Sequence, residues 1–140
     1  MRNVYLDTNV ILRFLLGDHP ELSPKAKSIF KLAEQNEIRL LIEPVILAEC
    51  CYVLGGKLYA DKFPSKQAIA ETLTKLLFLT GVNSTDQMLL TEVLEVYGEF
   101  EIDFADAYLA VIARKQSDLI AMFDRDFQQL EVETYVLGDG

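Results

Sequence analysis

The feature that most constrains the fold is a short apolar run, Val4 to Leu6, that stops abruptly on the carboxylate of Asp7. An apolar run rich in β-branched and aromatic residues and ended by a polar residue is typical of a strand inside a parallel sheet. Asp7 then lies at the carboxyl end of that strand, where open α/β sheets bind their ligands. Two interpretations stay open from this stretch alone: Asp7 takes part in chemistry, or Asp7, Thr8 or Asn9 caps the following helix.

The rest of the chain alternates between short apolar runs and segments with helical spacing of apolar residues. Further strands are expected at 39–42, 80–82, 119–123 and 134–137, and helices at 10–16, 23–34, 44–54, 65–77, 84–98 and 102–114. This alternation predicts an α/β fold, a three-layer sandwich with a short, mostly parallel central sheet flanked by helices. Because the chain has 140 residues, no internal repeat and no linker, we expect a single domain over 1–140.

Local signals mark where the helices begin and end. The expected N-terminal signals are Ser23–Pro24, Pro44, Ser65 and the capping-box pattern Ser84–Gln87. The expected C-terminal signals are two glycines, Gly17 and Gly98.

The composition excludes several classes of protein. A net charge of -9 at pH 7 argues against a general binder of the phosphate backbone, although it leaves room for a local basic patch. The single histidine, His19, and the adjacent Cys50 and Cys51 give no zinc-ligand spacing, and both cysteines lie in an apolar stretch where they act as small hydrophobes. The sequence shows no signal peptide and no run of about 18 apolar residues. We therefore expect a cytoplasmic protein that does not enter the membrane.

Two acids interrupt apolar helical segments. Glu49 is the single charge within Val45–Leu54, and because an ionised carboxylate is almost never buried alone, it is paired, binds a metal or lies at a solvated edge. Asp103 and Asp106 stand three residues apart and share a helix face. We expect Asp103 to act mainly as an N-cap and Asp106 to be mainly functional, although an acid in the first turn also complements the helix dipole.

A fourth acid, Asp124, repeats the pattern of Asp7 because it follows the apolar run 119–123. Asp7, Glu49, Asp106 and Asp124 are thus positions at which a carboxylate is costly without a partner. Two carboxylates about 4 Å apart repel by roughly 4 kcal/mol at an effective dielectric constant of about 20, so converging acids need a cation. Oxygen ligands favour Mg²⁺ or Mn²⁺, which can activate water and neutralise charge on a phosphodiester. The pattern predicts metal-assisted phosphodiester hydrolysis.

Four motifs in this order resemble those of the PIN-domain nucleases: Tyr5–Asn9, Glu49 within its apolar helix, Asp103–Ala107 and Phe123–Phe127. The resemblance covers essentially the whole chain, whose size is that of the VapC-type toxins of bacterial and archaeal toxin–antitoxin pairs. It implies that Asp7, Glu49, Asp106 and Asp124 are the catalytic, metal-coordinating acids. By the same resemblance Thr8 or Asn9 supports the site, and Asp103 and Asp126 are auxiliary. The chain departs from the family at Met122, where many relatives carry Thr or Ser.

The resemblance also implies a substrate and partners. Relatives are ribonucleases that cut single-stranded or looped RNA, are usually homodimers, and are silenced by an antitoxin whose tail enters the acidic site. RNA contacts would then come from basic residues around the acidic centre, although most are expected to be solvated surface. The candidates are Arg13, Lys57, Lys62, Lys66, Arg114 and Arg125.

Three other interpretations compete with a nuclease. A non-catalytic PIN-like module could bind RNA or a partner without cutting, but it would have no use for four clustered acids. A phospho-accepting receiver needs paired early acids and a late lysine near a strand end, where this chain has Asp124. An aspartate-nucleophile phosphatase needs an acid two residues after Asp7, and Asn9 occupies that place.

Overall fold

The structure is a computed structural model that describes residues 1–123 and 130–137. Within these residues a parallel sheet has the strand order β1-β2-β3, formed by Arg2–Tyr5, Ile38–Ile42 and Val82–Ser84. A second parallel sheet pairs β4 (Ile120–Met122) with β5 (Thr134–Val136). The expected α/β class with parallel strands is confirmed, and each expected strand is present within two residues of its predicted bounds.

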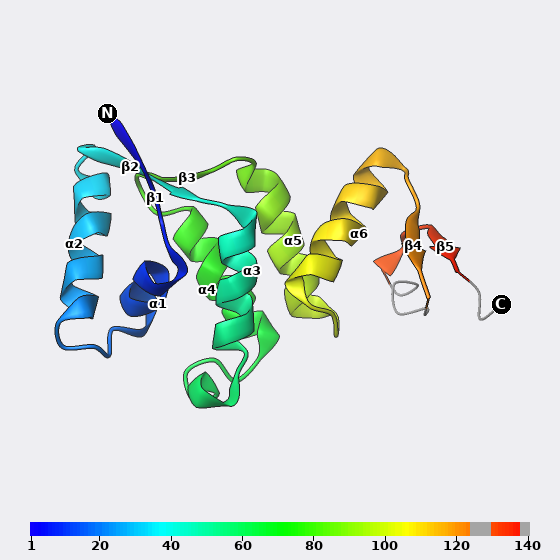
Figure 1. Cartoon of the computed structure of the whole chain (residues 1–140), viewed down its shortest axis with the longest axis horizontal. Helices are drawn as coiled ribbons and strands as arrows, with labels where there is room; N and C mark the ends of the chain where they lie inside the picture. The colour runs from blue at the N-terminus through cyan, green and yellow to red at the C-terminus, as the bar shows by residue number, and fades with distance from the viewer. Residues whose placement is uncertain (124–129, 138–140) are drawn as a thin grey trace.

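Six α-helices accompany the strands in the described part of the chain. They are α1 (Thr8–Leu16), α2 (Leu22–Glu34), α3 (Pro44–Leu54), α4 (Lys66–Leu77), α5 (Gln87–Glu99) and α6 (Phe104–Gln116), with a short 3₁₀ turn at Lys57–Tyr59. Figure 1 shows α2 at one end of the molecule and the β4–β5 sheet at the other, with α6 between α5 and that sheet. None of these helices is both long and apolar enough to span a bilayer.

The first sheet is held by buried aliphatic residues of its middle strand. Leu40 and Ile42 on β2 are fully buried, and Leu40 stands beside Val4 on β1 and Val82 on β3. The parallel direction follows from the helices that connect consecutive strands. Because the strands run in one direction, the residues that follow β1, β2 and β3 gather at one edge of the sheet, which is where the first predicted acid lies.

The described β-strands form two sheets rather than one. We expected the late strands to extend a central sheet, but β4 pairs with β5, and the only described strand that pairs with β1 is β2. The third strand also begins two residues later than expected, because Gly81 has a φ of +86° and forms the turn before it. A Cβ at Gly81 would lie 2.4 Å from the carbonyl oxygen of Ala33, so this turn packs directly against the end of α2.

Several helix ends follow their local signals. Pro44 opens α3 in its first turn, and the Ser65 side chain accepts a hydrogen bond from the Ala68 amide at the start of α4. Gly17 ends α1 in the left-handed conformation, with a φ of +60°. These positions depend on contacts within one turn of helix, which is why the sequence pattern predicts them.

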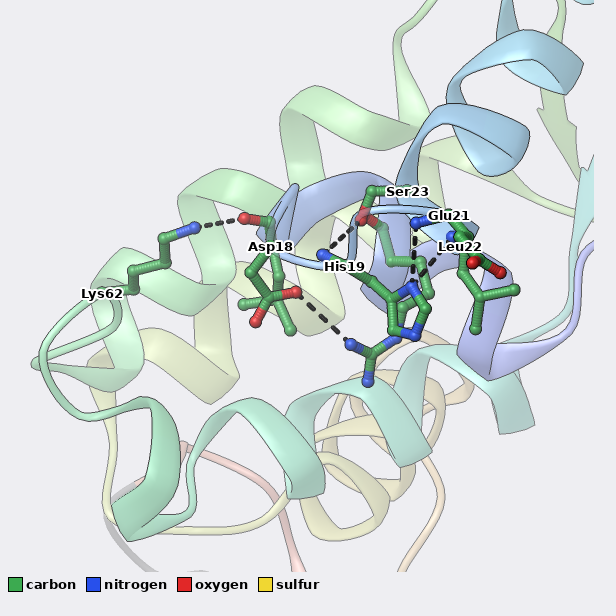
Figure 2. A network of polar contacts seen from close by, with 8 residues as sticks. Asp18, His19, Glu21, Leu22, Ser23 and Lys62 are labelled. Carbon is green, nitrogen blue, oxygen red and sulfur yellow. Dashed lines mark hydrogen bonds and ion pairs between the residues drawn. The ribbon is translucent and has the colours of Figure 1, made fainter.

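Three predicted helix ends are wrong, and each was displaced by another contact. Helix α2 begins at Leu22 rather than at Ser23, because His19 Nδ1 accepts hydrogen bonds from the amides of Glu21 and Leu22 at 3.2 and 2.9 Å (Figure 2). Ser23 is buried, and its hydroxyl donates to the carbonyl oxygen of Arg13. The histidine therefore supplies the cap that we assigned to the serine.

The other two wrong ends belong to α5. Asp86, not Ser84, caps this helix by accepting from the Leu89 amide at 3.0 Å, while Gln87 donates to the carbonyl oxygen of Leu77. Gly98 lies inside α5 rather than after it. A Cβ at Gly98 would come within 2.9 Å of the Ala70 Cβ, so the glycine is there for close packing of α5 on α4.

Candidate active site

Asp7 occupies the predicted place at the carboxyl end of β1 and also caps the next helix. Its Oδ2 accepts a hydrogen bond from the Asn9 amide at 3.3 Å, and its side chain is exposed. Within the described residues its second carboxylate oxygen makes no hydrogen bond. The capping interpretation of Asp7 is thus confirmed, and it leaves one oxygen available for a ligand. Asn9 lies on the exposed side of the same first turn.

Two buried hydroxyls lie at the same edge of the sheet without a hydrogen-bond partner in the described structure. One is Thr8 Oγ1, directly after Asp7, and the other is Ser84 Oγ, at the end of β3. Buried hydroxyls are rarely left unsatisfied, and such groups mark places where water or an ion is expected. Sequence reasoning placed Thr8 in a supporting role but treated Ser84 only as a helix cap. The later start of β3, set by Gly81, is the signal that assigns Ser84 to the edge.

Glu49 lies on the exposed side of α3 and not in the core. It shares this side with Val45 and Tyr52, which are 69% and 84% exposed, whereas Leu47 and Cys50 on the same helix are buried. The structure therefore places Glu49 at a solvated edge, and its role as a metal ligand stays a prediction. An exposed carboxylate keeps its hydration, so the charge of Glu49 does not by itself require a cation.

Cys50 links Asp7 and Glu49 in space. Its thiol is buried, and its pKa is raised from 9.0 to about 12, first by burial and then by the negative charges of Glu49 and Asp7. Two carboxylates from different elements therefore lie close enough to influence one sulfur atom.

Asp103 and Asp106 lie at the start of α6, as the sequence predicts. Asp103 caps the helix, because its Oδ1 accepts a hydrogen bond from the Asp106 amide at 2.9 Å. Asp106 is half-buried in the first turn. The expectation that Asp103 acts mainly as a cap is confirmed, whereas the role of Asp106 stays a prediction.

The remaining predicted residues are less well placed by the structure. Asp124 and Asp126 lie outside the described residues, and Met122 is buried on β4. In the ranges 1–123 and 130–137, no three acidic, histidine or cysteine side chains gather closely enough to hold a metal ion. Convergence of all four acids stays a prediction.

Three of the candidate RNA contacts are engaged within the protein. Arg13 pairs with Asp18 at 3.3 Å, and Lys62 donates to the carbonyl oxygen of Leu16 (Figure 2). Lys66 donates to the carbonyl oxygens of Phe100 and Ile102. These contacts join segments far apart in the sequence, so charge patterning does not reveal them.

Two other basic candidates are on the surface. Lys57 and Arg114 are exposed, whereas Arg125 lies outside the described residues. Arg114 lines a cavity of about 500 Å³ between α5 and α6 together with Glu92, Glu95 and Glu99. Acids outnumber the arginine in this cavity, so it does not offer a basic surface to a phosphate backbone.

The chemical type of the candidate ligand atoms suits a hard divalent cation. Carboxylate oxygens of Asp7 and Glu49 and the unpaired hydroxyl of Thr8 are all oxygen ligands, the class that Mg²⁺ and Mn²⁺ prefer. The Cys50 thiol is buried, whereas the side chains of Asp7 and Glu49 are exposed. The residues present therefore fit such an ion.

Comparison with known proteins identifies the family. A crystal structure of FitAcB from Neisseria gonorrhoeae is 19% identical to this chain, with a TM-score of 0.36, and the match covers 94% of this chain and 96% of that one. A structure of FitAB bound to an IR36 DNA fragment is 20% identical, with a TM-score of 0.35 and coverage of 95% and 94%. No curated protein matches the chain. The sequence profile of the PIN domain, in contrast, matches residues 4–133, from β1 to the residue before β5, so this protein belongs to the PIN-domain family.

Proposed function

We propose that this protein is a metal-dependent endoribonuclease. PIN domains are typically metal-dependent nucleases, and this chain carries the family profile over nearly its whole length. The single observation that carries the proposal is the position of Asp7 at the carboxyl end of β1, where one carboxylate oxygen makes no hydrogen bond in the described residues and the next residue, Thr8, has a buried, unpaired hydroxyl. A carboxylate oxygen and a hydroxyl are both oxygen ligands of the kind that a hard divalent cation prefers.

The acids would divide the work in the following way. Asp7, Glu49, Asp106 and Asp124 would hold Mg²⁺ or Mn²⁺, with Thr8, Asn9, Asp103 and Asp126 in support. When bound, such an ion supplies an activated water and neutralises charge on the scissile phosphodiester. Asp7 is held for this task by its hydrogen bond from the Asn9 amide, which fixes one carboxylate oxygen and leaves the other directed away from that amide.

The first turn of α6 would contribute in the same way. The Asp103 side chain accepts a hydrogen bond from the Asp106 amide, which fixes the backbone from which the Asp106 side chain extends. A ligand held on a helix is placed more reproducibly than one on a loop. Asp103 would therefore act through helix α6 rather than on the ion itself.

The substrate and partners follow from the sequence resemblance alone. The substrate class is single-stranded or looped RNA, and the biological context is a VapC-type toxin in the cytoplasm, active as a homodimer and silenced by a cognate antitoxin. A net charge of -9 fits this assignment, because an acidic protein is a suitable ligand for a basic antitoxin segment but a poor general binder of nucleic acid.

Cleavage of a pool of cellular RNA tests the proposal. The protein is incubated with Mg²⁺ or Mn²⁺ and, in parallel, with EDTA, and the Asp7→Asn variant serves as the control for contaminating nucleases. Discrete cuts that need the metal and vanish in the variant are expected, and mapping of the new ends then identifies the substrate. If the RNA stays intact and Mn²⁺ has no effect on the melting temperature, a non-catalytic PIN-like module is the correct interpretation.

A further inference from the structure

Lys66 has an unusual place for a lysine. It is the first residue of α4, directly after the N-cap Ser65. A cation in this position opposes the helix dipole, which favours negative charge at the N-terminus. Lys66 therefore does not stabilise its own helix through its charge, and its contacts with other elements explain its position.

The ammonium group of Lys66 contacts the turn between α5 and α6. Its Nζ donates to the carbonyl oxygen of Phe100 at 2.6 Å and to the carbonyl oxygen of Ile102. The same nitrogen lies 4.5 Å from the centre of the Tyr97 ring, which belongs to the last turns of α5. Because an ammonium has three hydrogens, two carbonyls and one aromatic face account for all of them.

The Ile102 carbonyl group needs this donor, whereas the Phe100 carbonyl oxygen also accepts a hydrogen bond from the Ile102 amide at 3.0 Å. Ile102 is buried, and in the described residues its carbonyl oxygen accepts no backbone hydrogen bond. A buried carbonyl without a partner is costly, and a charge-assisted hydrogen bond is the stronger kind. Gly98 allows α5 to approach the start of α4, since a Cβ there would lie 2.9 Å from the Ala70 Cβ and 3.3 Å from the Gln67 Cα. The packing thus brings Lys66 to the turn.

The turn leads directly into the candidate site. Asp103 follows Ile102 and caps α6, and the same cap binds the amide of Asp106. Glu101 and Asp103 also attract the charged form of Lys66 and so oppose the lowering of its pKa by burial. The ammonium group therefore contacts the backbone of residues 100–102, which directly precede the N-cap Asp103.

We propose that Lys66 is a positioning residue, whose ammonium joins the carbonyls of Phe100 and Ile102 and so fixes the start of α6 and the Asp106 side chain. The effect of Lys66 on metal binding rests on the proposed function. The joint between α4 and the α5–α6 turn, by which we mean the hydrogen bonds from Lys66 to Phe100 and Ile102, does not depend on it. Lys66 is thus withdrawn from the set of RNA-contacting candidates.

Hydrogen exchange of the full chain tests the joint without any need for activity. In Lys66→Met, the amides of Ile102, Asp106 and Ala107 should exchange about tenfold faster than in the wild type, which corresponds to about 1.4 kcal/mol. Lys75→Met is the matched control, because Lys75 is an exposed lysine in the last turn of the same helix. Unchanged exchange in Lys66→Met would overturn the proposal. If that variant does not fold, Lys66→Gln, which keeps one donor group, should give intermediate exchange, and wild-type exchange would again overturn it.

Mn²⁺ binding tests the consequence for Asp106. Lys66→Met should bind Mn²⁺ at least about tenfold more weakly than Lys75→Met, a loss that corresponds to about 1.4 kcal/mol. Faster exchange with unchanged Mn²⁺ affinity would show that the joint exists but positions nothing in the site, which contradicts the positioning role. If the wild type itself binds no Mn²⁺, the proposed function has failed, and the exchange experiment still decides whether Lys66 holds the turn.

Discussion

The Asp103 carboxylate accepts the backbone amide of Asp106 at 2.9 Å, so one acid of the α6 pair caps the helix that carries the other. This relationship separates two roles that the sequence places side by side. A cap requires only an acceptor oxygen, which Asn also provides, whereas a carboxylate that binds a divalent cation also attracts it through its negative charge. Substitutions that keep the acceptor but remove the charge therefore distinguish the two roles.

Asp103→Ala should lower the stability by about 1 kcal/mol through loss of the cap, whereas Asp103→Asn should leave it nearly unchanged. For a chain of this size the alanine variant should melt roughly 3–4 °C lower. Thermal unfolding followed by circular dichroism without added metal measures the difference. Equal melting temperatures for the two variants would contradict the capping role.

Asp7 allows the same comparison with a functional readout. Asp7→Asn keeps the acceptor for the Asn9 amide and should fold as well as the wild type or better, but it should lose the response to Mn²⁺. In the wild type, Mn²⁺ at a hundred times its dissociation constant should add about 2.7 kcal/mol of stability. Asp7→Ala should lose both the response and about 1 kcal/mol. Melting curves with and without Mn²⁺ check this, and an Asp7→Asn variant that keeps the full response to Mn²⁺ would contradict the metal-binding role of Asp7.

The two buried thiols predict a loss of stability at high pH. The pKa values of Cys50 and Cys51 are both raised from 9.0 to about 12, chiefly by burial. Below pH 9 the native and unfolded chains both keep these protons, so stability does not depend on the thiols. Between pH 9 and pH 12 the unfolded chain loses them first, and stability should fall by up to about 1.4 kcal/mol per pH unit for each thiol.

Urea unfolding at a series of pH values measures this dependence. Cys50→Ala, which removes one thiol, should show a shallower decline above pH 9 than the wild type, whatever its stability at neutral pH. Tyr97 also has a raised pKa, mainly through burial, and adds to the decline in both proteins. Parallel curves for the two proteins would contradict the assignment to Cys50.

Two glycines with positive φ offer a matched test of packing. Gly17 and Gly81 have φ values of +60° and +86°, so alanine is strained at both positions by about 1–2 kcal/mol. At Gly81 the new Cβ would also lie 2.4 Å from the carbonyl oxygen of Ala33, whereas at Gly17 nothing lies within 4 Å. Gly81→Ala should therefore cost about 2 kcal/mol more than Gly17→Ala. Urea midpoints for both variants check this, and similar losses would mean that the turn before β3 is not packed on α2.

Local patterns predict the parts of this fold that depend on local contacts. The strand before Asp7, the helix opened by Pro44, the cap at Ser65 and the cap at Asp103 all follow from signals within a few residues. The PIN-domain family is likewise visible in the order of the acidic motifs and is confirmed by the profile match.

Features that depend on contacts distant in sequence are not predictable in this way. Glycine ends helices in many proteins, but Gly98 lies inside α5 and allows its close contact with Ala70. Glu49 lies in an apolar segment, yet α3 leaves Val45 and Tyr52 on its exposed side together with it. The division of the strands into two sheets also depends on pairing partners, which alternation of strands and helices does not specify.

The proposed function requires that Asp7 and Glu49 share one divalent cation, and a Mn²⁺ titration followed by electron paramagnetic resonance tests this most directly. The wild type should bind Mn²⁺, and Asp7→Asn and Glu49→Gln should each weaken binding at least about tenfold, or about 1.4 kcal/mol. Glu37→Gln, which removes one exposed charge between α2 and β2, is the control and should bind as the wild type does. Equal Mn²⁺ affinity in all four proteins would contradict the account.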